Sequence, residues 1–206
     1  MIWYHNIALA AFLVCFISLS YHFIRLIRLG APKDYSQKAG NLKSAITYSF
    51  LGAMSPGKKE SAYLHLPTYI AGLLYHFGTF TAIVLFFLFL VNIDLTGSMR
   101  WASIGMLAFS GLSGGGILLK RMTVKKLRSL SSPDDYFSNL MVTVFQFFTL
   151  GMLVKESFAP IYFLCVSLLL LYLPLGKLKH ALYFFAARYH LGFFYGWRGI
   201  WSAKKM

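Results

Sequence analysis

Residues 66–92 read LPTYIAGLLYHFGTFTAIVLFFLFLVN, a run that contains no Asp, Glu, Lys or Arg. A helix rises about 1.5 Å per residue, so about 20 apolar residues cross a bilayer core that is about 30 Å thick. The run does not alternate with a period of two, which excludes a strand of a membrane barrel. This stretch therefore predicts a transmembrane helix.

Other segments of the chain share this apolar character, and each is long enough to cross a bilayer. They cover residues 6–24, 99–119, 137–154 and 158–177. The 206-residue chain is 58% hydrophobic and 13% charged, so its polar residues are too few to cover a water-soluble globule. We predict an all-α integral membrane protein: a five-transmembrane-helix bundle forming a single membrane domain over residues 1–206.

The basic residues are distributed unevenly between the two sides of the predicted bundle. Of 20 Lys and Arg, 18 fall on one side, together with the whole net charge of +14. The positive-inside rule then places the N-terminus outside and the C-terminus in the cytoplasm. We expect a multi-pass protein of the cell membrane, that is, the inner or plasma membrane.

This basic face has two readings, which are compatible. One is topology together with attraction to anionic lipid, and the other is a docking face for an acidic soluble subunit. Nucleic acid is not an expected partner, because the charges flank membrane spans instead of forming a folded basic domain.

Two segments outside the spans complete the predicted organisation. The loop over residues 25–64 has room for a short amphipathic helix but not for a catalytic domain. The tail over residues 178–206 mixes aromatic and basic residues, which is typical of an interfacial helix or of a cytoplasmic continuation of the fifth span.

Of the six histidines, His76 lies deepest in a predicted span. A titratable group in hydrocarbon is costly, so it is functional by default unless a hydrogen bond to a neighbouring helix accounts for it. Coordination of iron by one nitrogen of a neutral imidazole would offset the cost of placing the group in hydrocarbon. His180 lies at the inner end of the fifth span, which runs antiparallel to the second, so the two histidines have similar predicted depths. This pattern indicates a b-type haem with His76 and His180 as axial ligands of its iron.

The depth of this haem follows from the residues around His180. Lys177 and Lys179 extend towards the headgroups, which places the haem in the inner half of the bilayer. We expect Pro174 to bend the fifth span just before the ligand, and the two lysines to reach the haem propionates.

His65 and His190 form a second candidate pair, displaced inwards from His76 and His180. They are candidates for a second haem on the cytoplasmic side. The alternative is a pair of interfacial histidines, because Pro67 makes His65 a residue that precedes its helix.

The two cysteines carry no predicted chemistry. Cys15 and Cys165 stand alone in apolar spans and lack the spacing of a metal or iron-sulfur site, so they are read as packing residues. The motifs of soluble nucleotide-binding and hydrolytic enzymes are also absent from the sequence.

Three stretches resemble a known family: YHFG at residues 75–78, SGGGILLKRMTVKKLRSLSSPDDYFSNLMVTVFQFFTLGML at 113–153, and LPLGKLKH at 173–180. They are similar to the cytochrome b membrane subunit of respiratory nitrate reductase, the gamma subunit. That family includes membrane subunits of heterodisulfide-reductase-like and sulfate-reducer redox complexes. The resemblance implies a five-helix bundle with haem ligands on helices two and five. It also implies quinol oxidation or quinone reduction coupled to a soluble iron-sulfur partner.

The resemblance breaks at the positions that would hold an outer haem. There the nitrate reductase subunit has histidines, and this chain has Phe86 and Tyr162. Neither side chain normally replaces histidine in a low-spin b haem. The resemblance therefore implies one haem instead of two stacked across the membrane.

These observations predict a haem b subunit of a respiratory redox complex. It would transfer electrons between the membrane quinone pool and a cytoplasmic iron-sulfur or flavin subunit, with no catalysis by the chain alone. The alternative is a haem-free membrane anchor that tethers a soluble redox enzyme by the same helices and basic face.

Overall fold

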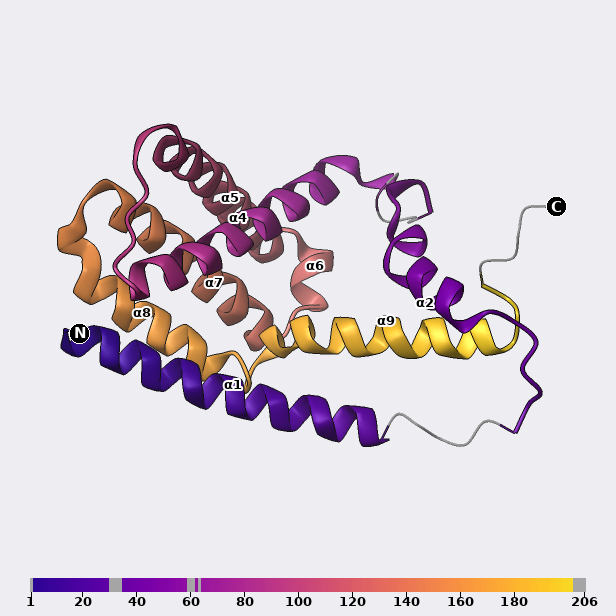
Figure 1. The fold of residues 1–206 in the computed structure, drawn as a ribbon. Helices are drawn as coiled ribbons and strands as arrows, with labels where there is room; N and C mark the ends of the chain where they lie inside the picture. Colours follow the sequence, from indigo (N-terminus) through magenta and orange to yellow (C-terminus); the bar gives the residue numbers. More distant parts are fainter. Residues whose placement is uncertain (1, 30–34, 59–61, 63, 202–206) are drawn as a thin grey trace. The chain divides into compact units, whose positions relative to one another are not determined.

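The computed structural model describes residues 2–29, 35–58, 62 and 64–201 of the chain. Within these residues every regular element is an α-helix or a short 3-10 helix (Figure 1). Several are long and apolar enough to span a membrane: α1 (Trp3–Leu29), α4 (Leu66–Leu90), α5 (Gly97–Thr123) and α7 (Pro133–Val154). They coincide with the first four predicted spans, each to within a few residues.

The fifth span is predicted as one helix over residues 158–177, bent at Pro174. In the structure this segment is interrupted. After a 3-10 turn (η3, Glu156–Phe158), α8 covers Ala159–Tyr172 and then ends. Pro174 has no N–H to continue the helical hydrogen bonds, and the N–H groups of Leu175 and Gly176 both donate to the carbonyl of Tyr172 at 2.9 Å. A 3-10 turn (η4, Lys177–Lys179) and α9 (His180–Trp197) follow. Pro174 thus contributes to a break in the span, and α8 alone is about 21 Å long, short of a full crossing.

The chain divides into two compact units. Unit 1 is Met1–Phe16 with Pro67–Leu178, and unit 2 is Ile17–Leu66 with Lys179–Met206. The boundary falls inside α1 and again just before α9. The single domain over residues 1–206 stays a prediction. Residues 202–206 of the predicted tail lie outside the described residues, as do 30–34, 59–61 and 63 of the predicted loop.

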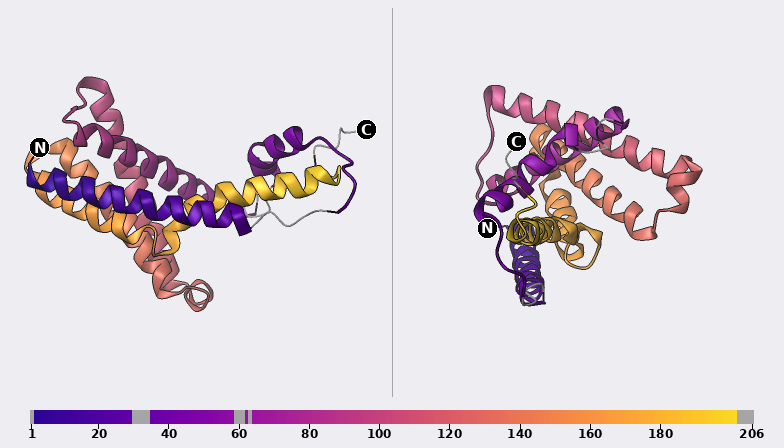
Figure 2. Two further views of the ribbon diagram at one scale, coloured as in Figure 1. Left: turned by 60° about the horizontal axis from the view of Figure 1, so that its bottom comes forward. Right: turned by 90° about the vertical axis from the view of Figure 1, so that its right-hand side faces the viewer.

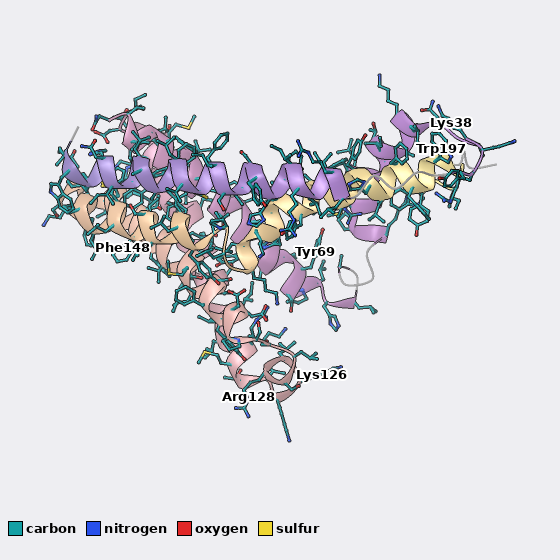
Figure 3. The ribbon with its side chains drawn as sticks, turned by 90° about the horizontal axis from the view of Figure 1, so that it is seen from below. Lys38, Tyr69, Lys126, Arg128, Phe148 and Trp197 are labelled. Carbon is teal, nitrogen blue, oxygen red and sulfur yellow. The ribbon has the colours of Figure 1, made fainter. Side chains whose placement is uncertain are left out.

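Unit 1 is built on apolar packing of α4, α5, α7 and α8. Helices α5 and α7 lie side by side, joined by the short helix α6 (Lys125–Ser129), and α8 follows α7 (Figures 1 and 2). Lys126 and Arg128 extend from α6 (Figure 3). The buried core gathers residues of every long helix of this unit, among them Ala8, Leu85, Leu107, Phe145 and Phe163.

Helix boundaries in unit 1 follow from local sequence. The α7 helix begins with Ser132-Pro133-Asp134-Asp135: the proline occupies the first turn, and the backbone N–H of Ser132 donates to the Asp135 carboxylate at 2.9 Å. At the other end of α7, Arg100 Nε donates to the carbonyl of Leu153 at 2.8 Å. A guanidinium at a helix C-terminus satisfies an orphan carbonyl and interacts favourably with the helix dipole.

Unit 2 contains a short helix in the loop, which the sequence had room for: α2 (Leu42–Phe50), followed by two 3-10 turns (η1, Gly52–Met54; η2, Pro56–Lys58). Asn41 caps α2, accepting from the N–H of Ser44 at 3.1 Å. Helix α2 packs along α9, and Ser49 Oγ donates to the carbonyl of Arg188 at 2.7 Å (Figures 1 and 2). The chain before α2 is fixed as well, because Trp197 Nε1 donates to the carbonyl of Ser36 at 2.8 Å (Figure 3).

The contact between α2 and α9 depends on glycines. A Cβ added at Gly192 would lie 2.6 Å from the Cα of Ile46, and one added at Gly196 would lie 2.5 Å from the Cβ of Ala45. The first obstacle is backbone, so it cannot be relieved by turning a side chain. The two helices therefore touch because residues 192 and 196 lack side chains.

We predict that Gly192→Ala destabilises unit 2 by about 1–3 kcal/mol, since the added methyl forces the helices apart. The measurement is the thermal midpoint of the purified chain in detergent. Gly105→Ala is the matched control, because a Cβ there meets nothing within 4 Å and alanine favours the helix. A midpoint for Gly192→Ala equal to that of the control would contradict close packing of α2 on α9.

Candidate functional site

His76 lies on the surface of unit 1, on α4. Its side chain is exposed, and its ring centroid is 6.4 Å from that of Phe80, one turn further along the helix. The preceding residue, Tyr75, points into the contact with α7, where its hydroxyl donates to the carbonyl of Asn139 at 2.9 Å. Successive helical residues point about 100° apart. Helix α4 therefore directs Tyr75 into the unit and leaves the imidazole of His76 at its surface.

His180 is the first residue of α9, and its side chain is also exposed. It belongs to unit 2, whereas His76 belongs to unit 1. The pairing of His76 with His180 joins residues of separate units, and it stays a prediction.

The second candidate pair lies within unit 2. His65 is exposed in the bend that precedes α4, which agrees with the expectation drawn from Pro67. His190 is partly buried on α9, and among the described residues its Nε2 has no hydrogen-bond partner. A second haem between His65 and His190 stays a prediction, as does the alternative of two interfacial histidines.

Aromatic side chains fill the region around the two positions at which the resemblance would require outer-haem histidines. Phe86 is 3% exposed and Tyr162 is fully buried. The ring of Tyr162 lies 5.0 Å from Phe163 and 5.7 Å from Phe89, and Phe86 lies 6.3 Å from Phe163. These rings pack edge to face or tilted, as aromatic cores do. The region is occupied by protein side chains.

His5 is part of the same core. It is 5% exposed, and its ring lies 4.3 Å from Phe163 and 4.7 Å from Tyr4. Its Nδ1 has no hydrogen-bond partner among the described residues. The burial of His5 could not be predicted from the sequence, because His5 stands at the end of a predicted span.

A buried polar network joins α4, α5 and α7 next to His76. Ser110 and Gln146 are both fully buried. Ser110 Oγ lies 2.8 Å from Gln146 Oε1, and Gln146 Nε2 donates to Thr79 Oγ1 at 2.7 Å and to the carbonyl of Tyr75 at 3.1 Å. The amide is therefore bonded at both ends. Sequence reasoning missed this network, although a glutamine inside an apolar span is a usable signal for a bond between helices.

The glycines near His76 fall into two groups. An added Cβ at Gly78 would collide with Ser110, and one at Gly114 would collide with Tyr75, so these two permit close packing within unit 1. An added Cβ at Gly72 meets nothing within 4 Å, as at Gly115 and Gly116. Gly72 precedes His76 by four residues, so both lie on the same face of α4. The backbone next to the imidazole is thus open to a flat ligand.

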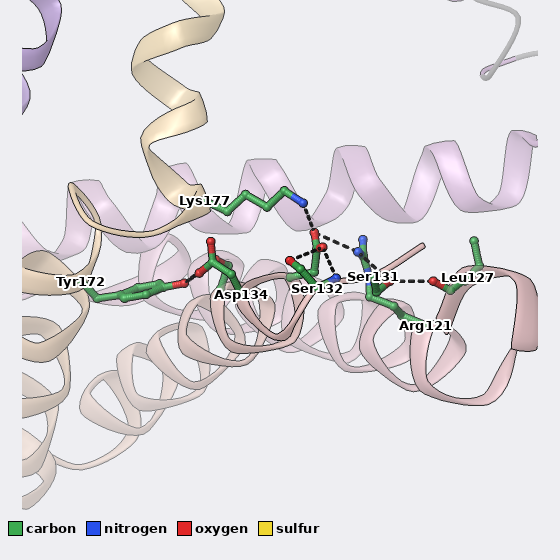
Figure 4. A network of polar contacts seen from close by, with 9 residues as sticks. Arg121, Leu127, Ser131, Ser132, Asp134, Tyr172 and Lys177 are labelled. Carbon is green, nitrogen blue, oxygen red and sulfur yellow. Dashed lines mark hydrogen bonds and ion pairs between the residues drawn. The ribbon is translucent and has the colours of Figure 1, made fainter. Parts of the chain in front are cut away.

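Figure 4 shows an ionic cluster at the junction of α5, α7 and η4. The Asp135 carboxylate pairs with Lys177 Nζ at 2.6 Å and with Arg121 NH1 at 3.1 Å. The hydroxyl of Tyr172 contacts Asp134 and lies 2.8 Å from Ser138 Oγ. Lys177 therefore already has an anionic partner, while Lys179 precedes His180 as the N-cap residue of α9. The propionate contacts proposed for both lysines stay predictions.

Metal chemistry other than haem has no support among the described residues, where no group of three or more His, Cys, Asp or Glu is placed to hold an ion. Cys15 and Cys165 are free thiols in the structure. A six-coordinate haem needs two protein ligands, so this observation does not bear on it.

Comparison of the chain with family models, with curated proteins and with solved structures gave no match. The resemblance described above therefore rests on the sequence stretches alone.

We predict that Ser110→Ala lowers the stability of unit 1 by about 1–3 kcal/mol, because it leaves the buried Oε1 of Gln146 without its donor. Ser113→Ala is the matched control on the same helix: its hydroxyl donates to the carbonyl of Phe109 in α5 itself. Thermal midpoints in detergent compare the two variants. Equal midpoints would show that the network contributes nothing between helices.

We predict that Asp135→Asn lowers stability by about 1 kcal/mol, because Lys177 and Arg121 lose their shared anion. The value is small because the Lys177 side chain is 55% exposed. The difference from the unmodified chain should shrink as NaCl is added, since salt screens the pair. Asp94→Asn, in the exposed turn before α5, is the control for a general charge effect; the same loss in both variants would contradict a specific ionic cluster.

Proposed function

We propose that this chain is the haem b subunit of a membrane redox complex, transferring electrons between the quinone pool and a cytoplasmic iron-sulfur or flavin subunit. One observation carries the proposal: a histidine deep in an apolar helix has its imidazole exposed beside an open glycine. His76 and Gly72 share a face of α4, where His76 is exposed and Gly72 is partly buried, with nothing within 4 Å of a Cβ added to it. A titratable side chain at membrane depth is costly, and such residues usually serve a function.

The proposed topology has five spans, with the N-terminus outside and the C-terminus in the cytoplasm. The proposed location is the cell membrane, that is, the inner or plasma membrane. Helices α1, α4, α5 and α7 supply four spans, and α8 with the turns between it and α9 supplies the fifth. The support for orientation is the charge asymmetry of the sequence, with 18 of 20 basic residues on one side.

The residues present suit a b-type haem. Two histidines offer neutral nitrogen ligands, and Gly72 leaves room for a flat macrocycle next to His76. Bound haem would supply a one-electron couple. The chain's own part is to hold the imidazole at fixed depth, and the bond from Gln146 Nε2 to the carbonyl of Tyr75 fixes the helix one residue before it. A propionate contact from Lys177 would compete with Asp135.

The aromatic core supports the absence of an outer haem at Phe86 and Tyr162. Phe86 and Tyr162 are packed among other rings, and neither offers a nitrogen ligand. A second macrocycle in this region would have to displace several buried aromatic side chains, each a large loss of packing.

The test is the haem content of the purified full-length chain. The pyridine haemochrome should give one haem per chain, and the reduced-minus-oxidised spectrum should show a b-type signal. His76→Ala and His180→Ala should each abolish that signal, because a low-spin b haem needs both axial ligands. The controls are His65→Ala and His190→Ala, which should leave it unchanged.

Each other outcome changes the proposal. A haem content near zero with a folded chain would favour the alternative, a haem-free anchor for a soluble redox enzyme. Two haems per chain, one of them lost in His65→Ala and His190→Ala, would establish the second pair. A b-type signal that survives in His76→Ala would remove this residue as a ligand.

A further inference from the structure

Helix α9 and its C-cap residue Arg198 carry two pairs of arginine and phenylalanine. The guanidinium of Arg188 lies 5.6 Å from the ring centroid of Phe184, and that of Arg198 lies 3.8 Å from that of Phe194. Each arginine follows its phenylalanine by four residues, so each pair lies along the helix surface. The rings stay exposed beneath their cations, at 38% for Phe184 and 47% for Phe194.

The pairs share one side of α9, together with Leu191. At about 100° per residue, these five residues fall within about 120° of one another. We call this set the Arg-Phe face. Helix α2 packs on the neighbouring side of α9, at Gly192 and Gly196, and Ser49 of α2 donates to the backbone carbonyl of Arg188. The Arg-Phe face therefore borders the contact with α2, and the side chains of Phe184, Leu191 and Phe194 stay exposed beside it.

The net charge of unit 2 indicates the charge of the binding partner of this face. The sequence of unit 2 contains twelve Lys and Arg and two acidic residues, so its net formal charge is +10 of the total +14. A surface of this sign attracts anionic groups, at about fivefold in equilibrium for each basic residue near an anionic membrane.

We propose that the Arg-Phe face of α9 lies in the membrane interface and binds anionic phospholipid. The phenylalanine rings and Leu191 would enter the boundary between headgroups and acyl chains. Arg188 and Arg198, whose guanidinium groups lie over those rings, would present their remaining N–H donors to the phosphates. This arrangement matches a lipid interface. The exposed aromatic and aliphatic side chains suit the apolar acyl chains, and the arginine cations suit the anionic phosphate oxygens. The proposal does not depend on haem binding.

The test places a fluorescent label on the full chain in lipid vesicles. In a Cys15→Ala and Cys165→Ala background, Leu191→Cys carries the label, and Lys43→Cys on the exposed side of α2 is the reference. Vesicles contain phosphatidylcholine with or without phosphatidylglycerol. A label at residue 191 should be quenched by lipid-attached nitroxide and protected from aqueous iodide, with the reverse at residue 43. Iodide quenching as strong at 191 as at 43 would overturn the proposal.

A second measurement tests the two arginines. Arg188→Gln with Arg198→Gln should lower the ratio of docked to undocked label by about fivefold for each charge in phosphatidylglycerol vesicles. Lys38→Gln with Lys43→Gln removes the same charge from unit 2 and should have a smaller effect. Equal effects would overturn the specific role of the Arg-Phe face. Protection of residue 191 that requires an added soluble protein would show a protein interface and overturn lipid binding.

Discussion

The arrangement of unit 1 depends on a rule of apolar surroundings: a buried polar group must be bonded, because no water is there to bond it. Gln146 meets this rule by reaching two helices at once. Its amide donates to Thr79 and to the carbonyl of Tyr75 on α4, and its oxygen lies within bonding distance of the Ser110 hydroxyl on α5. Slippage of any one helix would leave the amide unsatisfied. The position of His76 along α4 is thereby fixed against α5 and α7.

Charged residues in unit 1 act at helix ends. Arg100 bonds the last carbonyls of α7, and Asp135 at the first turn of α7 gathers Arg121 and Lys177. Acids at a helix N-terminus and cations at a C-terminus both agree with the helix dipole. The two ends of α7 are therefore held by neighbouring segments through ionic groups, while its middle is held by packing and by Gln146.

Length and hydropathy predicted four of the long helices well, because an apolar run long enough to cross a bilayer has few alternatives. The loop over residues 25–64 had room for a short helix, and α2 lies there. The break after Tyr172 was harder to predict. Pro174 within an apolar run is compatible with a kinked helix or with an ended one, and the turn that closes on the Tyr172 carbonyl decided it. The network around Gln146 could not be predicted in detail, because the partners come from helices far apart in sequence.

The contact of α2 with α9 leaves room for one methyl group where Ala45 meets residue 196. In this chain that methyl group is the side chain of Ala45 on α2, but the same space could hold the methyl group of an alanine at residue 196. Among homologous sequences, this crossing should therefore show compensating exchange, with glycine at position 45 wherever alanine stands at 196. Position 192 has no such freedom, because its neighbour is the Cα of Ile46, which every residue possesses. Among homologous sequences, glycine should therefore be retained at position 192 and be replaceable by alanine at position 196.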